Sequence, residues 1–245
     1  MERLKNSLRY VLMRLHIDLT MNIRYDRLTK QIMKKIIKND SNCIDVGCHK
    51  GEILNIILKY APQGTHYGFE PIPLLFSRLK EKYSGTATIY PYALSDKDGQ
   101  SSFQYVKNAP AYSGIKRRKY DDVKNPDIEE IIVELKMLDH IIPADIKIDF
   151  IKIDVEGGEF AVLKGAKELL KKHSPTLIFE CGMGASDCYG TNPLDIYNYL
   201  TEDLDFNIYT LGSFTKNKAF LTAEEFQHYF QTGEEYYFVA VPFAK

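Results

Sequence analysis

The chain has 245 residues, a formal net charge of −1 and 44% hydrophobic residues. This length and hydrophobic content can form a buried core in one large domain or two small ones. A nearly neutral charge excludes the general positive field of a non-specific nucleic-acid binder, so we expect no nucleic-acid partner. The charge is uneven, because residues 1–41 contain ten Lys or Arg and four Asp or Glu.

Cysteines and apolar runs indicate the compartment. No apolar run has the length of a membrane span, and no signal-peptide core follows the first residues. Cys43, Cys48, Cys181 and Cys188 lack the spacing of a zinc site or a C-x-x-C redox motif. We therefore expect a soluble, reduced protein of the cytoplasm.

The first part of the chain predicts helices. "MERLKNSLRYVLMRLHIDL" has apolar residues at helical spacing between basic ones, and "RYDRLTKQIMKKIIK" is a second helical stretch before the turn "NDSN". We predict a helical extension over residues 1–40 and a main domain over residues 41–245. The basic helices could contact an anionic membrane. They could equally form a lid or a dimer element, which we favour, so an oligomer is one open alternative.

From residue 43 onward, strands alternate with helices. The expected strands "NCIDVG", "THYGFEP" and "TATIYPYAL" are separated by the helices "KGEILNIILKYA" and "IPLLFSRLKEKY". A predicted strand pair, "SSFQYV" and "EIIVELKML", then flanks a long polar loop, which indicates an inserted β-hairpin at about residues 100–138. The chain continues with "FIKIDV", the helix "EFAVLKGAKELLKK", "TLIFEC", the helix "PLDIYNYLTED", "FNIYTLG" and "EYYFVAVPF". This order predicts an α/β fold with a mostly parallel sheet and helices on both faces.

The turn after the first predicted strand has the features of a ligand site. Asp45 ends the strand, and Gly47 and Gly51 lie in the turn. Gly47 permits a tight turn, and Gly51 lets the next helix begin close beneath a ligand. The G-x-x-x-G spacing differs from the G-x-G-x-x-G pattern that holds a pyrophosphate. A carboxylate here would repel phosphates but suits a ligand that carries an ammonium or sulfonium group.

A second acid follows at the end of the next strand. Glu70 lies 25 residues after Asp45. A carboxylate at this position can accept hydrogen bonds from ribose hydroxyls, as it does in dinucleotide sites. Asp45, Gly47, Gly51 and Glu70 together predict a pocket for a cationic nucleoside, S-adenosylmethionine. The alternative is that Asp45 caps a helix and Glu70 is an ordinary surface acid.

A third segment, "DFIKIDVEGGE", places charges on a core strand. Lys152, Asp154 and Glu156 recur at every second residue and should point to one face of the sheet. We predict that Asp154 and Glu156 contact the acceptor, the cofactor or both, as general base or orienting group. Lys152 is expected to pair with both acids and keep them ionised. The alternative is an ion network that only holds the end of the strand.

These motifs together resemble those of FkbM-type methyltransferases. The segments "CIDVGCHKGE", "YGFEPIP", "ALSDKDG", "MLDHII" and "FIKIDVEGGEFAVLKGA" occur in that family's order over roughly residues 40–212. The resemblance implies a Rossmann-like class I methyltransferase fold with a seven-stranded sheet in the order 3-2-1-4-5-7-6. It also implies S-adenosylmethionine as donor and O-methylation, often of sugars or other glycan and natural-product hydroxyls.

The resemblance also implies residue roles. Asp45, Gly47 and Gly51 match the methionine-binding loop and Glu70 matches the ribose acid, while the segment around Ala93 would lie near the adenine. His49 and Lys50 depart from the Asn-x-Gly ending that is most common in the family. The predicted cofactor-binding set is Asp45, Gly47, Cys48, His49, Gly51, Glu70, Pro71, Ala93, Leu94 and Ser95.

Several groups have open roles. Paired carboxylates could hold Mg²⁺, but no third acid evidently converges on them, so we do not favour a metal. Asp139 is expected to cap the start of its own helix, and His140 remains open as a general base.

Two segments should overhang the acceptor: the loop with Tyr112, Ser113 and "KRRK", and "CGMGASDCYGTNP". We favour a solvated loop for "KRRK", balanced by Asp121 and Asp122, over a phosphate contact.

The main functional prediction is an S-adenosylmethionine-dependent O-methyltransferase that acts on a hydroxyl of a sugar, a glycan or a related small molecule. One alternative is methylation of nitrogen in nucleic acid or protein. The turn Asp-Val-Glu-Gly disfavours it, because many amino-group enzymes of this fold have an Asn/Asp-Pro-Pro-Tyr/Phe turn there. The other alternative is a scaffold that binds the cofactor without turnover.

Overall fold

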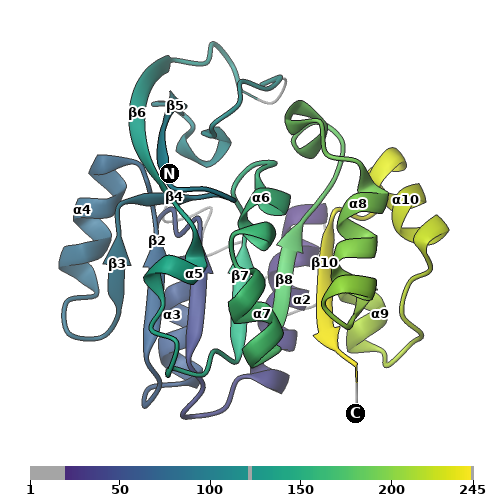
Figure 1. Ribbon diagram of the computed structural model, residues 1–245. Helices are drawn as coiled ribbons and strands as arrows, with labels where there is room; N and C mark the ends of the chain where they lie inside the picture. The colour runs from purple at the N-terminus through teal and green to yellow at the C-terminus, as the bar shows by residue number, and fades with distance from the viewer. Residues whose placement is uncertain (1–19, 121–122, 244–245) are drawn as a thin grey trace.

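The computed structural model describes residues 20–120 and 123–243 (Figure 1). The helix predicted at the start of the chain lies outside these residues, as do Asp121 and Asp122. The described chain forms a seven-stranded sheet with helices on both faces and a smaller three-stranded sheet above one edge.

The main sheet has the strand order β3-β2-β1-β7-β8-β10-β9. Its strands are parallel except β10, which runs antiparallel to both of its neighbours, β8 and β9. Counted along the main sheet, this is 3-2-1-4-5-7-6, so the predicted fold class and strand order are confirmed. The strands are Cys43–Val46 (β1), His66–Phe69 (β2), Thr88–Tyr90 (β3), Phe150–Ile153 (β7), Thr176–Glu180 (β8), Phe206–Thr210 (β9) and Tyr237–Pro242 (β10).

Helices bury an apolar core on each face of this sheet. On one face α2, α3 and α9 pack over the strands, and on the other face lie α6, α7, α8 and α10 (Figure 1). The helices are Met21–Ile36 (α2), Glu52–Tyr60 (α3), Pro73–Lys82 (α4), Leu138–Ile141 (α5), Glu159–Lys164 (α6), Lys167–His173 (α7), Pro193–Asn198 (α8), Leu211–Thr215 (α9) and Ala223–Thr232 (α10). The 3₁₀ turns are Pro110–Tyr112 (η1) and Ser186–Tyr189 (η2), and a π-helical turn covers Tyr199–Asp203 (η3).

The segment "TATIYPYAL", predicted as one strand, is two strands in two sheets. β3 ends at Tyr90 and β4 covers Tyr92–Leu94, because Pro91 between them has no N–H for a strand ladder. β4 pairs in parallel with β6 (Ile128–Lys136), which pairs antiparallel with β5 (Gly99–Val106). The inserted hairpin rises beyond the edge toward which the parallel strands of the main sheet point (Figure 1).

α2 belongs to the core of this fold. Its buried residues Tyr25, Leu28, Ile32 and Met33 pack with residues of α3 and the sheet. Thr20 caps the helix, since its hydroxyl accepts a hydrogen bond from the Ile23 N–H at 3.3 Å. The apolar face of α2 is thus used inside the protein. Within the described ranges, no helix combines the length and the apolar character needed to cross a bilayer.

We predict that Ile32→Ala lowers the free energy of unfolding by about 2–5 kcal/mol, because the Ile32 side chain is fully buried and the truncation leaves a cavity. Urea denaturation followed by circular dichroism measures the change. Lys34→Ala, on the exposed side of α2, serves as control and should stay within about 0.5 kcal/mol of the native protein. An unchanged midpoint for Ile32→Ala would mean that α2 is not part of the cooperative fold.

Candidate cofactor and acceptor site

Polar side chains gather where β1, β7, β8 and β10 meet at one edge of the sheet. Alternation along each strand decides which face they share: Phe150 of β7 packs into the α2 core, whereas Ile151 and Ile153 pack into the opposite core. Lys152 therefore lies on the α2 face, paired in register with Asp45 of β1. Glu180 and Tyr237 form the last register pair of β8 and β10, on the same face.

The turn after β1 is held against its neighbours by glycine. Gly47 has a φ of +82°, and a side chain at this position would collide with the backbone carbonyl of Asp154. The N–H groups of Gly47 and Cys48 both donate to the Phe69 carbonyl of β2 at 3.0 Å. Gly51, with a φ of +79°, precedes α3, and a side chain there would collide with Tyr83. Both glycines are thus required by close packing, and the turn lies directly beside the end of β7.

Glu70 ties this turn to the segment after β2. Its Oε2 accepts from the His49 N–H at 2.8 Å, and its Oε1 accepts from the Ile72 N–H at 3.0 Å. Each carboxylate oxygen has a second lone pair for a ligand hydroxyl. Burial raises the pKa of Glu70 to about 7, and the charge of Asp45 adds to the increase. Glu70 and Asp45 lie at the same end of adjacent strands, as the sequence predicts, because β1 and β2 are parallel and Asp45 pairs with Gly68.

The turn has unsatisfied polar atoms that fit the predicted cofactor. Asp45 is almost fully buried, and burial raises its pKa to about 7 against the opposing effect of Lys152. In the described part of the chain, Asp45 Oδ2 and His49 Nε2 are buried without a hydrogen-bond partner. Buried polar atoms normally have partners, so such atoms at a strand end point to a ligand. Asp45 could hold an ammonium group, and Glu70 could hold ribose hydroxyls.

Other members of the predicted cofactor set have different surroundings. The Cys48 thiol is buried and donates to the Asp45 carbonyl at 3.2 Å, so its side chain serves the core. Pro71 is half-buried beside Glu70. Ala93 packs in the core of the small sheet, Leu94 packs in the main core, and the Ser95 N–H donates to the Lys136 backbone carbonyl. The role of residues 93–95 near the adenine stays a prediction.

Asp154 accepts two short hydrogen bonds just beyond β7. Its Oδ2 lies 2.6 Å from Lys152 Nζ and 2.7 Å from the Tyr237 hydroxyl, which both donate to it. Burial alone would raise the pKa of Asp154, but the Lys152 ammonium and these hydrogen bonds outweigh burial and hold the pKa below its ordinary value. Asp154 is therefore ionised at neutral pH.

Glu180 is the neutral partner of Asp154. Its Oε2 lies 3.3 Å from the Tyr237 hydroxyl, and its carboxyl is in hydrogen-bonding reach of Asp154. Burial, followed by the negative charges of Asp154, Glu156 and Glu159, raises the pKa of Glu180 well above its ordinary value. We call Lys152, Asp154, Glu180 and Tyr237 the strand-end cluster; its two carboxyl groups together hold one proton and one negative charge at neutral pH.

Sequence reasoning missed Glu180 and Tyr237. Glu180 ends "TLIFE" as Glu70 ends "HYGFE", a signal that was present in the sequence. Tyr237 lies 83 residues after Asp154 and reaches it only because β10 inserts beside β8. Because Tyr237 and Val239 are two residues apart on one strand, the pattern could have indicated that Tyr237 lies on the same face of the sheet as α2. It could not have indicated that Asp154 is its partner.

The expectation for Glu156 is wrong in two respects. β7 ends at Ile153, and Glu156 has a φ of +60°, so the alternation of the strand does not extend to this residue. Its carboxylate forms an ion pair with Arg118, whereas Lys152 bonds to Asp154. Burial and then the charge of Asp154 raise the pKa of Glu156 to about 8, despite Arg118. Lys152 therefore does not keep both acids ionised.

The interpretation of "KRRK" as a solvated loop is wrong for Arg118. Its side chain is only 12% exposed, pairs with Glu156 and lies over the Tyr112 ring at 4.9 Å. The neighbouring Lys116 N–H donates to the Tyr189 hydroxyl of η2 at 3.2 Å. The inserted loop and the segment after β8 therefore meet over the end of β7, where they can contact an acceptor.

Asp139 and His140 have structural surroundings. The Asp139 carboxylate accepts from the N–H groups of Glu168 and Leu169 at 3.0 and 2.9 Å, so it caps α7. The expectation that Asp139 caps its own helix is therefore wrong. Asp139 is the second residue of α5, whose N-cap position is Met137, so it does not occupy the N-cap of its own helix. His140 is mostly exposed and lies 3.2 Å from Asp98. Among the residues that the structure describes, no three His, Cys, Asp or Glu side chains are arranged as a metal site.

A twisted sheet of this order, with acids at the ends of β1, β2 and β7, is the architecture of a Rossmann-like methyltransferase. The family model "Methyltransferase FkbM domain" matches residues 45–208, and the chain therefore belongs to the FkbM methyltransferase family. The members of this family are classified as methyltransferases.

One curated protein and one solved structure are similar to this chain. The 2-O-methyltransferase NoeI of Sinorhizobium fredii is 27% identical over 164 residues, which cover 60% of this chain and 65% of that protein. The structure of Methyltransferase FkbM from Methylobacillus flagellatus has a TM-score of 0.51 and 17% identity, over 83% of this chain and 44% of that one. At that identity the likeness concerns the fold alone. The chain spans less than two thirds of the length of either relative.

We predict that Glu70→Gln weakens S-adenosylhomocysteine binding by about tenfold or more, because a hydrogen bond to a charged group contributes about 1.5–3 kcal/mol. Calorimetry measures the affinity, and Glu81→Gln on exposed α4 is the matched control. Binding to the native protein should also weaken as the pH falls from 8 to 6, since Asp45 and Glu70 lose their charge below about pH 7. An affinity that is constant over this range would contradict the assignment.

Proposed function

We propose that the protein transfers a methyl group from S-adenosylmethionine to a hydroxyl of a sugar, a glycan or a related small molecule. Family membership supports the donor, and the name of the NoeI relative supports oxygen as the acceptor atom. The observation that carries the proposal is the position of ionised Asp154. It lies beside the Gly47 turn, where the cofactor would bind, and accepts hydrogen bonds from Lys152 and Tyr237.

The proposed reaction needs a place for one proton. Bound S-adenosylmethionine would supply an electrophilic methyl group on a sulfonium. Transfer of that methyl group to the acceptor oxygen would release the hydroxyl proton, and Asp154 would accept it. Because its pKa is low, Asp154 is a weak base that orients the hydroxyl and takes the proton late in the reaction. Positioning the oxygen at roughly 3–3.5 Å from the methyl carbon supplies much of the acceleration.

Tyr237 and Glu180 would support Asp154 in this role. The Tyr237 phenol keeps its proton, since burial and the neighbouring acids raise its pKa well above the ordinary value, and it therefore acts only as a donor to Asp154. Neutral Glu180 fills the space beside Asp154 without adding a second negative charge. Asp154 thus keeps one fixed orientation toward the acceptor.

The proposal includes partners and location. The acceptor is a small molecule or glycan, and nucleic acid is not among the proposed partners. The chain has four free cysteines, three of them buried, as is common in the reducing cytoplasm, which we propose as the location. For the N-terminal region, residues 1–40, we propose a lid or a dimer element, with peripheral membrane contact through its basic residues as the alternative.

The proposal is tested with methyl-labelled S-adenosylmethionine and a panel of free sugars, nucleotide sugars and oligosaccharides, with products identified by mass spectrometry. We expect a product heavier by one methyl group on oxygen. Asp154→Asn should lower kcat by about 10²–10⁴-fold, the usual contribution of a general base, without abolishing S-adenosylhomocysteine binding. Full turnover by folded Asp154→Asn would remove this residue from the chemistry. Cofactor binding without product from any acceptor would favour the scaffold alternative.

Substitutions at the neighbouring positions test how Asp154 is supported. Tyr237→Phe deletes a donor to Asp154 and should lower kcat by about tenfold, whereas Tyr236→Phe deletes a hydroxyl that bonds to Asn22 and should have little effect. Glu180→Gln should stay within about threefold of the native kcat at pH 7, because an amide can donate a hydrogen bond as the neutral acid does. A loss of about 100-fold in Glu180→Gln would mean that ionised Glu180 is needed.

A further inference from the structure

The two residues that precede β10 are held by a tyrosine of α2. The Tyr25 hydroxyl accepts a hydrogen bond from the Tyr236 N–H at 3.1 Å and donates to Glu235 Oε2 at 2.9 Å. Tyr25 is only 3% exposed, and burial raises its pKa well above the ordinary value, so the phenol keeps the proton that it donates. One buried hydroxyl therefore fixes two successive residues directly before the strand.

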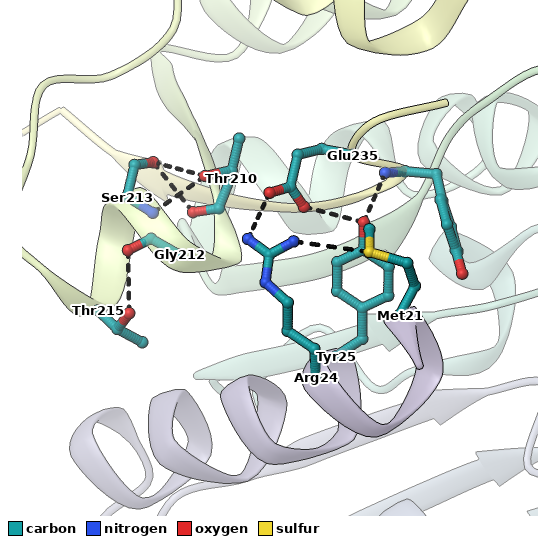
Figure 2. A network of polar contacts seen from close by, with 9 residues as sticks. Met21, Arg24, Tyr25, Thr210, Gly212, Ser213, Thr215 and Glu235 are labelled. Carbon is teal, nitrogen blue, oxygen red and sulfur yellow. Dashed lines mark hydrogen bonds and ion pairs between the residues drawn. The ribbon is translucent and has the colours of Figure 1, made fainter. Parts of the chain in front are cut away.

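Glu235 is bound through both of its carboxylate oxygens (Figure 2). Its Oε1 accepts from the Arg24 guanidinium at 2.5 Å, while its Oε2 accepts from Tyr25. Hydrogen bonds that involve charged groups are stronger than those between neutral groups. Arg24 is bordered in turn by α9, because a side chain at Gly212 would come within 3.3 Å of Arg24 Nη2. The segment before β10 is therefore anchored to α2 by an enclosed ion pair and by the Tyr25 hydroxyl.

The same tyrosine packs against the first residue of β10. The ring centroids of Tyr25 and Tyr237 are 5.1 Å apart, within the range of about 4.5–7 Å that is typical of aromatic pairs. Lys152 Nζ lies 5.3 Å from the centroid of the Tyr237 ring. The hydroxyl of this ring donates to Asp154 at 2.7 Å. The position of that donor thus depends on the contacts of the ring and on the backbone at the start of β10.

The backbone of Tyr236 is bonded on both sides. Its N–H donates to Tyr25, and its carbonyl accepts from the Cys181 N–H at 2.8 Å. The next residue, Tyr237, is paired in register with Glu180 at the end of β8. Loss of the Tyr25 hydroxyl would leave the Tyr236 N–H without its acceptor and would loosen this end of the β8–β10 pair.

We infer that Tyr25 is a positioning residue, which is fixed by Glu235 and holds the start of β10 so that the Tyr237 hydroxyl stays bonded to Asp154. This inference rests on the proposed function, in which ionised Asp154 orients the acceptor and takes its proton. Tyr25 acts through Tyr237 and not on the acceptor. Both α2 and β10 lie outside residues 45–208, the part of the chain that the family model matches.

Turnover measurements separate positioning from general support of the fold. Tyr25→Phe removes the hydroxyl but keeps the ring, and it should lower kcat by about three- to tenfold with the KM for S-adenosylmethionine within about twofold, because the interaction matters in the transition state. The matched control is Tyr197→Phe, which removes a hydroxyl that donates to the Leu221 carbonyl in the opposite core and should stay within about twofold in kcat. Thermal melting verifies that the variants are folded.

A double-mutant cycle tests whether Tyr25 acts through Tyr237. In the Tyr237→Phe background, Tyr25→Phe should change kcat by less than about twofold, since the donor that it positions is already absent. A general loss of packing would instead lower kcat by the same factor in both backgrounds, and that result would overturn the inference.

Amide hydrogen exchange followed by NMR tests the same contact without turnover. In Tyr25→Phe the Cys181 amide, which donates to the Tyr236 carbonyl, should exchange about tenfold faster than in the native protein. The Thr176 amide, which donates to the Asp149 carbonyl at the other end of β8, is the internal reference and should stay within about twofold. Unchanged exchange at Cys181 would overturn the inference. If no acceptor gives a product, the proposed function fails, while the exchange rates still decide whether Tyr25 holds the start of β10.

Discussion

The contact between Lys152 and Asp154 keeps two buried groups charged, and the other polar groups of the site are arranged around this pair. Lys152 is buried on the α2 face of the sheet, in register with Asp45 and 2.6 Å from Asp154. Burial penalises an ammonium, yet the two carboxylates raise the pKa of Lys152, so it keeps its charge. An unpaired buried charge would cost on the order of several kcal/mol. Lys152 thus keeps Asp154 ionised at the end of β7, and it reduces the pKa increase that burial causes in Asp45 of β1.

Acids in one place cannot all be ionised, and the fold assigns their protonation states by position. Asp154 receives both the ammonium and the phenol and stays charged. Glu180 lies beside Asp154 but is farther from the Tyr237 hydroxyl, at 3.3 Å, and burial together with the nearby acids raises its pKa, so it is neutral. Glu156 has a positive φ, and its side chain pairs with Arg118 of the inserted loop. The same fold that brings these groups together therefore gives each of them a separate electrostatic environment.

The sequence predicts the parts of this protein that depend on local pattern. Alternating strands and helices predict a mostly parallel sheet, and the family resemblance implies the order of its strands. Asp45 and Glu70 could be placed at strand ends because each follows an apolar run. Partners that are distant in sequence could not be predicted in this way. Tyr237 meets Asp154 only through the antiparallel insertion of β10, and Arg118 is buried only because Glu156 lies beneath its loop. Charged loops are usually solvated, so composition alone favoured the wrong interpretation of Arg118. Likewise, no pattern in "KIDVEGG" shows that the strand stops before Asp154.

The position of β10 also bears on how the molecule comes to be made. β10 lies between β8 and β9 in the sheet, although it follows both in the chain. During synthesis on a ribosome, β9 has no neighbour to pair with, and one side of β8 stays open, until residues 237–242 emerge. Asp154 and Glu180 then face each other without the phenol that separates their roles. A nascent chain that already contains every residue of the FkbM match, 45–208, consequently still lacks the hydrogen bond from Tyr237 to Asp154, which forms only when β10 joins the sheet.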